Sequence, residues 1–290
     1  DTYRVWAGAA HIKDTLYSSE TACIFGAEYF LTEQDYIKIA NLQFAGGINR
    51  TIWHGHASSW GPVSNTRWPG YEGMYSGLSS RLDSREPNSK DYIEMNNYFG
   101  RVQRLLREGV SRTDLGILRL NYGERTEYGI TYADYIGNHH GIYWQDMSLQ
   151  DAGYTYDYFA PDFLNLVEYD PETQTLGDTV GYQAILLHQQ RLPVDAAERL
   201  LTLAKQGLKV ILVGDAATIT PYHSETNEEL AAVVNELKAL DNVVVVDTEA
   251  DAYPALLEMG ITPRAELIGT NQILTQVRED ENDNLYVYAY

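Results

Sequence analysis

The chain has 290 residues, enough for two ordinary domains, and its 44% hydrophobic and 21% charged residues are typical of a folded rather than a disordered protein. Its formal net charge of −20 argues against nucleic acid and anionic membrane surfaces as partners, since both are negatively charged. The apolar runs are far shorter than the roughly 20 residues that a membrane span needs. A single cysteine, Cys23, cannot build a disulfide framework, and its apolar neighbours predict that it is buried and inert.

Strands and helices alternate in the first part of the chain. From the apolar periodicity we expect strands over 21–29, 48–53 and 114–120 and helices over 32–44 and 90–108. Thr32 is a suitable N-cap for the first helix, and Gly46 and Gly47 end it. Two long stretches rich in Gly, Pro, Trp or Tyr, 57–88 and 122–160, interrupt the alternation and read as functional loops. Alternation of this kind predicts parallel βα units.

The character of the sequence changes after Asp170-Pro171-Glu172. Beyond it we expect strands over 183–187, 209–213 and 243–246 and helices over 195–206, 228–240 and 252–259. A last strand is expected over 284–290. We therefore predict three parts: residues 1–172 as βα units, residues 173–275 as a small α/β domain, and residues 276–290 as the start of a β-domain. Because Asp1 is not a natural start, we expect the sequence to be a portion of a longer chain.

Tyrosine is unusually frequent, with 23 Tyr against 6 Phe. Tyr and Trp combine a flat apolar face with a polar edge. Sugars need both, because their C–H faces stack while their hydroxyl groups form hydrogen bonds. The composition therefore suggests carbohydrate binding, although ordinary packing would also account for it.

Active residues of βα sheets and barrels gather at the carboxyl ends of the strands. The first candidate there is Glu28, which follows the apolar run 23–27. A carboxyl group placed after a buried run is either paired with a neighbouring Arg or backbone group, or it does chemistry. Partial burial raises the pKa of a carboxyl group and suits it to proton donation.

Aromatic and histidine side chains follow the next strand. Trp53 and His54 alternate across it, and Gly55 permits a close approach of the backbone to a ligand before His56. Hydrogen bonding to sugar hydroxyls is the functional interpretation, and packed core histidines are the alternative. The long loop adds further candidates for a stacking platform over a cleft, namely Trp60, Trp68 and Tyr71.

A glycosidase needs a second carboxylate, which spacing along the chain cannot select. The acidic residues beyond the strand at 114–120 are Glu124, Glu127, Asp134, Asp146, Asp151, Asp157 and Asp162. In the later part, His188 follows an apolar strand, but no nucleophile motif accompanies it. Gly214-Asp215 likewise lacks the glycine pattern of a phosphate loop. We therefore expect the second domain to be structural.

Several of these segments resemble one family when taken in order. The run 25–30 (Phe-Gly-Ala-Glu-Tyr-Phe), the segment 47–50 leading to His54, the segment 68–70 (Trp-Pro-Gly) and the run 153–158 (Gly-Tyr-Thr-Tyr-Asp-Tyr) are similar to the catalytic barrel of family 106 glycoside hydrolases, the α-L-rhamnosidase type. The segment 203–210 is similar to the domain that follows that barrel, and 273–288 to the start of the succeeding β-domain.

This resemblance implies a fold and a mechanism. The expected fold is α/β: a partial (β/α) TIM-type barrel followed by a small flavodoxin/amidotransferase-like α/β domain. Glu28 matches the family's general acid, a second carboxylate would act as base in an inverting reaction, and calcium would aid sugar binding. For the base the resemblance leaves Asp157 and Glu124 as candidates.

The leading hypothesis is hydrolysis of terminal α-L-rhamnose, or a similar sugar, from an oligo- or polysaccharide by a secreted or periplasmic enzyme. Side chains that follow the second strand and lie in the long loop would hold the sugar: Trp53, His54, His56, Trp60, Trp68 and Tyr71. A glycosidase of other sugar specificity and a non-catalytic carbohydrate-binding fragment are the alternatives.

Overall fold

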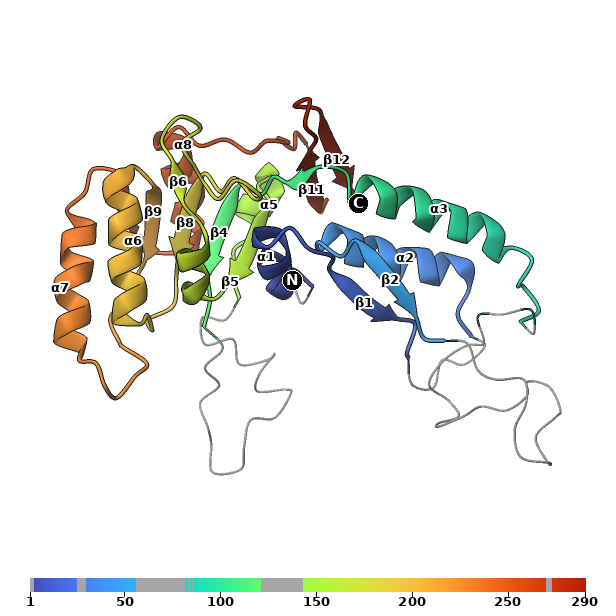
Figure 1. Ribbon diagram of the computed structural model, residues 1–290, viewed down its shortest axis with the longest axis horizontal. Coiled ribbons are helices and arrows are strands. Elements are labelled where there is room, and N and C mark those ends of the chain that lie inside the picture. The colour runs from blue at the N-terminus through green and yellow to red at the C-terminus, as the bar shows by residue number, and fades with distance from the viewer. Residues whose placement is uncertain are drawn as a thin grey trace. The chain divides into compact units, whose positions relative to one another are not determined.

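The structure is a computed structural model that describes residues 3–24, 30–55, 82, 84, 86–120, 143–269 and 273–290. The chain divides into two compact units (Figure 1). The smaller unit consists of residues 16–108 with Tyr290, and the larger unit of residues 1–15 and 109–289. Within the described residues, no helix is both long and apolar enough to cross a membrane.

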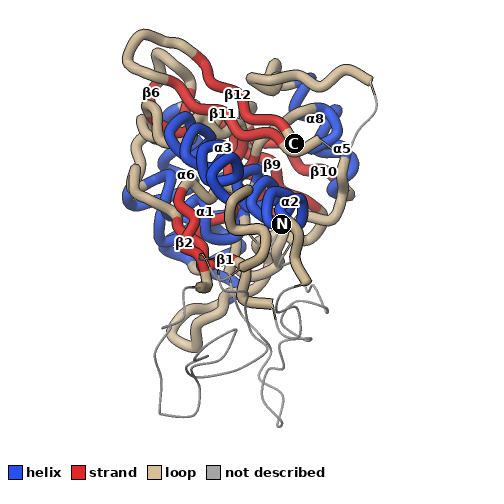
Figure 2. Tube along the Cα trace, turned by 90° about the vertical axis from the view of Figure 1, so that its right-hand side faces the viewer, coloured by secondary structure: helices blue, strands red, loops and turns tan. Residues whose placement is uncertain are grey.

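The smaller unit has the alternating order that the sequence predicts. Its elements are β1 (Ser18–Thr21), α2 (Glu33–Ala45), β2 (Arg50–Trp53) and α3 (Tyr92–Leu105). β1 and β2 pair in parallel, from Ser18 opposite Arg50 to Thr21 opposite Trp53. The two helices lie side by side (Figures 1 and 2).

Local sequence explains the bounds of α2. The Thr32 side chain accepts a hydrogen bond from the Asp35 backbone N–H, and the Asp35 side chain accepts one from the Thr32 N–H, which completes a capping box. The helix ends at Gly46, and Gly47 has a φ of 103°, which favours glycine. Both the N-cap and the glycine stop are therefore confirmed.

The first strand differs from its expected position. β1 ends at Thr21, the residue where the prediction began, and residues 22–24 have no regular structure. Cys23 is exposed, so the expectation of a buried thiol was wrong. The reason is that the strand ends at Thr21, so Cys23 and Ile24 lie beyond it and are exposed.

A five-stranded parallel sheet forms the centre of the larger unit, in the order β10-β9-β8-β4-β5. The strands are β4 (Leu115–Leu118), β5 (Tyr156–Phe159), β8 (Ala184–Leu187), β9 (Lys209–Val213) and β10 (Val243–Val246). Every residue of β4, β5 and β8 is buried. Burial on both faces is typical of a parallel sheet that helices cover on two sides.

Two hydrophobic clusters fill the two sides of this sheet. Along β8, Ile185 and Leu187 belong to the cluster that includes the helices α6 (Val194–Gln206) and α7 (Asn227–Lys238) (Figure 1). The alternate residues Ala184 and Leu186 belong to the cluster that includes α5 (Ser148–Ala152) and α8 (Ala252–Glu258). Helix α1 (Arg4–Ile12) packs against β5 at the edge of the sheet. This is a three-layer α/β arrangement.

Shorter elements complete the larger unit. β3 (Val110–Ser111), β11 (Thr275–Glu279) and β12 (Leu285–Ala289) form an antiparallel sheet in which β11 is central (Figure 2). The remaining elements are the strands β6 (Tyr169–Asp170) and β7 (Thr175–Leu176) and the 3-10 helices η1 (Pro161–Leu166) and η2 (Glu249–Asp251). The last predicted strand, over 284–290, is confirmed as β12.

The boundary expected at residues 172–173 lies between strands that share the five-stranded sheet. β4 and β5 precede it, whereas β8, β9 and β10 follow it. β4, predicted as a βα strand continuing from β2, pairs instead with β5 and β8. Strand pairing joins residues far apart in the chain, so the change in composition after Asp170 did not indicate which strands are neighbours. The domain limits at 172 and 275 stay a prediction.

Candidate active site

β1 and β2 end at the same edge of their parallel pair, at Thr21 and Trp53. The backbone N–H of His54 donates to the Thr21 carbonyl oxygen at 2.7 Å, which continues the pairing past the strands. Thr21 also donates through Oγ1 to Gln43 Oε1 at 2.9 Å, which ties α2 to β1. The residues that follow both strands therefore start from a fixed edge, where parallel βα units carry their chemistry.

Trp53 turns its ring toward the helices. Its ring centroid lies 5.8 Å from that of Tyr36 on α2 and 5.2 Å from that of Phe99 on α3. The Tyr36 contact is edge-on, a favoured geometry for aromatic packing. These contacts are those of a core side chain, and they account for the half-buried position of Trp53 without a ligand.

His54 is placed differently. Its Nδ1 atom is buried and has no hydrogen-bond partner within the part of the chain that the structure describes. A buried imidazole nitrogen without a partner costs free energy, and a hydroxyl group of a ligand would satisfy it. Next to it, a Cβ built on Gly55 would have Trp53 O as its nearest neighbour, at 3.8 Å. Among the described residues, no atom lies closer to that position.

A hollow of about 640 Å³ lies beside the start of α2. Residues that precede or begin α2 and α3 line it, namely Phe30, Leu31, Thr32, Glu33, Gln34, Glu86, Pro87, Asn88 and Asp91. The side chain of Phe30 is exposed to 81%, and Glu33 Oε1 is buried without a hydrogen-bond partner among the described residues. An exposed aromatic ring beside polar groups suits sugar binding. Sequence reasoning missed Phe30, although its place two residues after Glu28 was a usable signal.

Most of the predicted site residues lie outside the described residues: Glu28, His56, Trp60, Trp68, Tyr71 and Glu124. Glu28 belongs to the segment between Ile24 and Phe30, which both are described. Its roles and those of the loop aromatics stay predictions.

Asp157 is described and lies inside the larger unit. It is on β5 and only 3% exposed. Its Oδ2 atom lies 2.8 Å from His11 Nδ1 and accepts a hydrogen bond from the Tyr182 hydroxyl at 2.9 Å. Burial and the neighbouring Asp157 raise the pKa of Tyr182 well above its ordinary value, so the phenol stays a donor. These contacts are typical of a structural carboxylate held between two elements.

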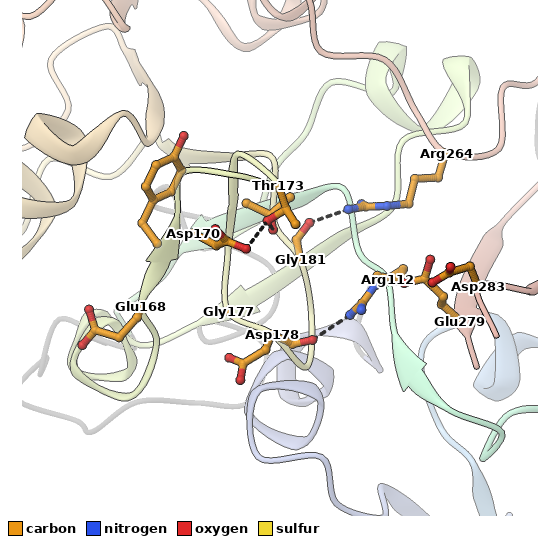
Figure 3. Close-up of a pocket in the computed structure, with 12 residues that line it drawn as sticks. Arg112, Glu168, Asp170, Thr173, Gly177, Asp178, Gly181, Arg264, Glu279 and Asp283 are labelled. Atoms are coloured by element: carbon orange, nitrogen blue, oxygen red, sulfur yellow. Dashed lines mark hydrogen bonds and ion pairs between the residues drawn. The ribbon is translucent and has the colours of Figure 1, made fainter. Parts of the chain in front are cut away.

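A second cavity, of about 700 Å³, lies in the larger unit (Figure 3). Arg112 pairs with Glu279 and donates to the Asp178 carbonyl oxygen at 2.8 Å. Arg264 donates to Gly181 O at 2.6 Å and pairs with Asp114 at 3.1 Å.

The two guanidinium groups are thus held by groups of the protein itself (Figure 3). Asp114 directly precedes β4 and Gly181 shortly precedes β8, so this cavity lies at the amino ends of the strands. Groups at that end of a parallel sheet serve stability more often than catalysis. The β1–β2 edge is therefore the stronger candidate for the active site.

The described residues contain no group of three or more His, Cys, Asp or Glu side chains arranged to hold a metal ion. The calcium that the sequence resemblance implies stays a prediction.

Three comparisons relate the chain to known proteins. The sequence matches the α-L-rhamnosidase family, glycoside hydrolase family 106, over residues 2–287. The chain matches no curated protein. Its structure is similar to a rhamnosidase from Novosphingobium sp. PP1Y, with a TM-score of 0.70, 21% sequence identity, and coverage of 95% of this chain and 26% of that one.

It is also similar to Gan42B, a GH42 β-galactosidase, with a TM-score of 0.54, 7% identity, and coverage of 97% of this chain and 48% of the other. The chain thus spans about a quarter of the rhamnosidase and about half of the β-galactosidase. At these identities the structural likeness shows the fold. The sequence match extends over almost the whole chain, and on that ground the chain belongs to glycoside hydrolase family 106, the α-L-rhamnosidase family.

Proposed function

We propose that the protein hydrolyses a terminal α-L-rhamnose, or a similar sugar, from an oligo- or polysaccharide. The observation that carries this proposal is the family match over residues 2–287. The β1–β2 edge supports it, because His54 and the exposed ring of Phe30 supply there the polar and aromatic groups that sugars need.

In the proposed mechanism Glu28 is the general acid. Its carboxyl proton passes to the glycosidic oxygen as the bond from that oxygen to the anomeric carbon breaks. A water molecule attacks the anomeric carbon from the opposite face, and a second carboxylate takes its proton. The product sugar leaves with inverted configuration, which requires the two carboxyl groups to be roughly 6.5–9.5 Å apart.

Glu124 and Asp157 are the candidates for the base. Asp157 is poorly suited to activating water, because it is 3% exposed and its Oδ2 atom is already engaged by His11 and Tyr182. We therefore favour Glu124 over Asp157.

Sugar binding would involve the side chains that follow β2. His54 would accept or donate a hydrogen bond through its buried Nδ1 atom. His56, Trp60, Trp68 and Tyr71 stay in the proposal as predicted from the sequence. Trp53 is the weakest member, because its ring packs on Tyr36 and Phe99.

We further propose that the β1-α2-β2-α3 segment is part of a (β/α) TIM-type barrel, and that the five-stranded sheet belongs to a flavodoxin/amidotransferase-like α/β domain. The parallel pairing within each unit supports both parts. A secreted or periplasmic location would suit a polysaccharide substrate. Calcium stays a proposal of the sequence resemblance, and no step above depends on it.

The test compares Glu28→Gln with Glu94→Gln, which makes the same change on the exposed side of α3. In the full-length protein we expect release of rhamnose from an α-L-rhamnosyl disaccharide to fall about 100-fold or more in Glu28→Gln, because the departing sugar hydroxyl needs a proton and a positioned acid contributes at least that factor. Glu94→Gln should match the unmodified protein. The anomer formed first, observed by NMR, reports inversion or retention.

Three outcomes would count against parts of this proposal. Full activity of Glu28→Gln would remove the acid role. Turnover of another glycoside, but not the rhamnoside, would favour a different sugar specificity. Sugar binding without turnover of any glycoside would favour a non-catalytic binding module.

A further inference from the structure

The carboxyl edge of the five-stranded sheet in the larger unit carries a second group of buried polar side chains. Arg119 and His188 each stand two residues beyond the paired residues Ile117 and Leu186 of β4 and β8. Side chains two residues apart on a strand share a face, so both lie on the face that Ile117 and Leu186 present. Trp144 belongs to the hydrophobic cluster on that same face.

These three side chains hold buried nitrogen atoms without hydrogen-bond partners in the part of the chain that the structure describes. They are Nε and Nη2 of Arg119, Nε1 of Trp144 and Nε2 of His188. Arg119 is 5% exposed, Trp144 is 3% exposed, and the side chain of His188 is 3% exposed. Most buried polar groups in folded proteins are hydrogen-bonded. Several unpaired buried nitrogen atoms on one face of the sheet therefore indicate a site where a ligand could accept or donate hydrogen bonds.

Contacts hold the group together. The ring centroids of Trp144 and His188 lie 5.4 Å apart. The Arg119 guanidinium carbon lies 5.2 Å from the ring centroid of Tyr143, the residue before Trp144. The Gln189 side chain accepts from the Leu120 N–H at 2.6 Å and donates to the Leu120 carbonyl oxygen at 3.1 Å. The residues that follow Arg119 and His188 are therefore fixed to each other.

Glu249 orients His188 from the end of β10. Its Oε1 atom lies 2.6 Å from His188 Nδ1, and its Oε2 atom accepts from the N–H groups of Gln145 and Asp146 at 2.6 and 2.9 Å. Burial by itself raises the pKa of Glu249, but these hydrogen bonds together hold it below its ordinary value. An ionised Glu249 keeps a proton on Nδ1, so Nε2 is the nitrogen left to meet a ligand.

The chemistry of the orphaned nitrogens selects the ligand. Guanidinium and indole N–H groups only donate, so an acceptor must meet them. A buried cationic Arg is costly without a counter-charge, which makes an anion the favoured acceptor. The Nε and Nη2 atoms form the planar edge that binds a carboxylate through two parallel hydrogen bonds. We infer that this edge of the sheet binds the carboxylate of a small hydroxy acid, with Arg119 and Trp144 donating to the carboxylate and His188 Nε2 accepting a hydrogen bond from a hydroxyl group of the ligand.

The inference does not depend on the proposed hydrolysis, because Arg119, Trp144 and His188 are not among the residues proposed to hold or cleave the sugar. Of its three residues, only His188 lies in the part after residue 172, which the sequence analysis expects to be structural. The sequence shows that His188 follows a strand. It does not show that Arg119 and Trp144, which are 69 and 44 positions away in the chain, belong to the same group.

The test measures binding of glucuronate by isothermal titration calorimetry, with glucose as its neutral counterpart and inorganic phosphate as another oxyanion. We expect glucuronate to bind at least tenfold more tightly than glucose or phosphate. Arg119→Met and Trp144→Phe should each weaken glucuronate binding about tenfold or more, since a hydrogen bond to a charged group has roughly that effect. Arg101→Met, which removes the same charge from an exposed position of α3, should leave binding unchanged.

Equal binding of glucuronate and glucose would overturn the inference, and so would an Arg119→Met protein that binds as well as the unmodified one. Tighter binding of phosphate would overturn the assignment to carboxylate. If Arg119→Met does not fold, Trp144→Phe decides the matter, because it removes Nε1 and keeps an aromatic ring in the hydrophobic cluster.

Discussion

His11 and Asp157 form a buried pair that joins helix α1 to strand β5. Nδ1 of His11 lies 2.8 Å from Oδ2 of Asp157, and the two side chains are only 5% and 4% exposed. The residues are 146 positions apart in the chain. The pair, together with the Tyr182 hydroxyl, explains how an acidic residue can occupy the middle of a strand whose every residue is buried.

Replacing Asp157 should therefore affect folding before it affects chemistry. We expect Asp157→Asn to lower the free energy of unfolding by about 1–3 kcal/mol, because the charged acceptor of two buried donors is lost. Denaturant unfolding measures this change. Asp162→Asn, at an exposed position of η1, should change stability by less than about 0.5 kcal/mol.

The same variant separates the two roles proposed for Asp157. With a structural role, activity per folded molecule stays within a few-fold of the unmodified protein. A catalytic base would behave in the opposite way, with stability retained and kcat reduced about 100-fold or more. That second pattern would restore Asp157 as the base.

Two helical glycines should respond to alanine with opposite signs. On α1, a Cβ at Gly8 would lie 2.4 Å from the Tyr158 carbonyl oxygen, and the backbone of β5 cannot easily move away. We expect Gly8→Ala to destabilise the protein by about 1–3 kcal/mol through overpacking. On α3, no described residue comes within 4 Å of a Cβ at Gly100, so Gly100→Ala should stabilise the protein by roughly 0.5–1 kcal/mol.

Thermal unfolding of the two alanine variants, side by side, provides the measurement. Each serves as the control for the other, because both make the same substitution inside a helix. A stable Gly8→Ala protein would show that α1 does not pack closely on β5.

Asp280 organises the turn between β11 and β12. Its carboxylate accepts from the Asn284 side chain at 2.9 Å, from the Asn284 N–H at 3.0 Å, from the Asn282 N–H at 2.9 Å and from the Tyr286 hydroxyl at 2.9 Å. These hydrogen bonds, the Asn284 side chain first among them, lower the pKa of Asp280 from 3.8 to about 2. The pKa in the folded state is thus below its unfolded value, so the contribution to stability is present above pH 3.8 and is lost as the pH falls through about 2.

Titration of the Asp280 carboxyl carbon by NMR tests this account. Asn284→Ala should raise the pKa of Asp280 toward 3.8, because it removes the largest lowering influence. Asn282→Ala should leave the pKa near 2, because Asn282 acts through its backbone N–H, which the substitution keeps. Equal shifts in both variants would mean that the turn as a whole, rather than the Asn284 amide, sets this pKa.

Local sequence determined many of the individual elements. β10 occupies residues 243–246 as predicted, and α6 and α7 differ from their predicted bounds by one or two residues. Helix periodicity, capping residues and short apolar runs are properties of neighbouring residues, so they can be read from the chain itself. The same local signals placed Thr32 at the start of α2 and His54 directly after β2.

Only the tertiary structure decided how the strands pair and which polar groups meet. The sequence did not predict β5, because an Asp between two tyrosines does not indicate a buried strand. Asp157 can be buried there because His11 and Tyr182 form hydrogen bonds with it. Likewise, Arg119 and His188 become neighbours only because β4 pairs with β8. Pairing of strands depends on hydrogen bonds and burial between segments far apart in the chain, and those contacts form only in the folded molecule.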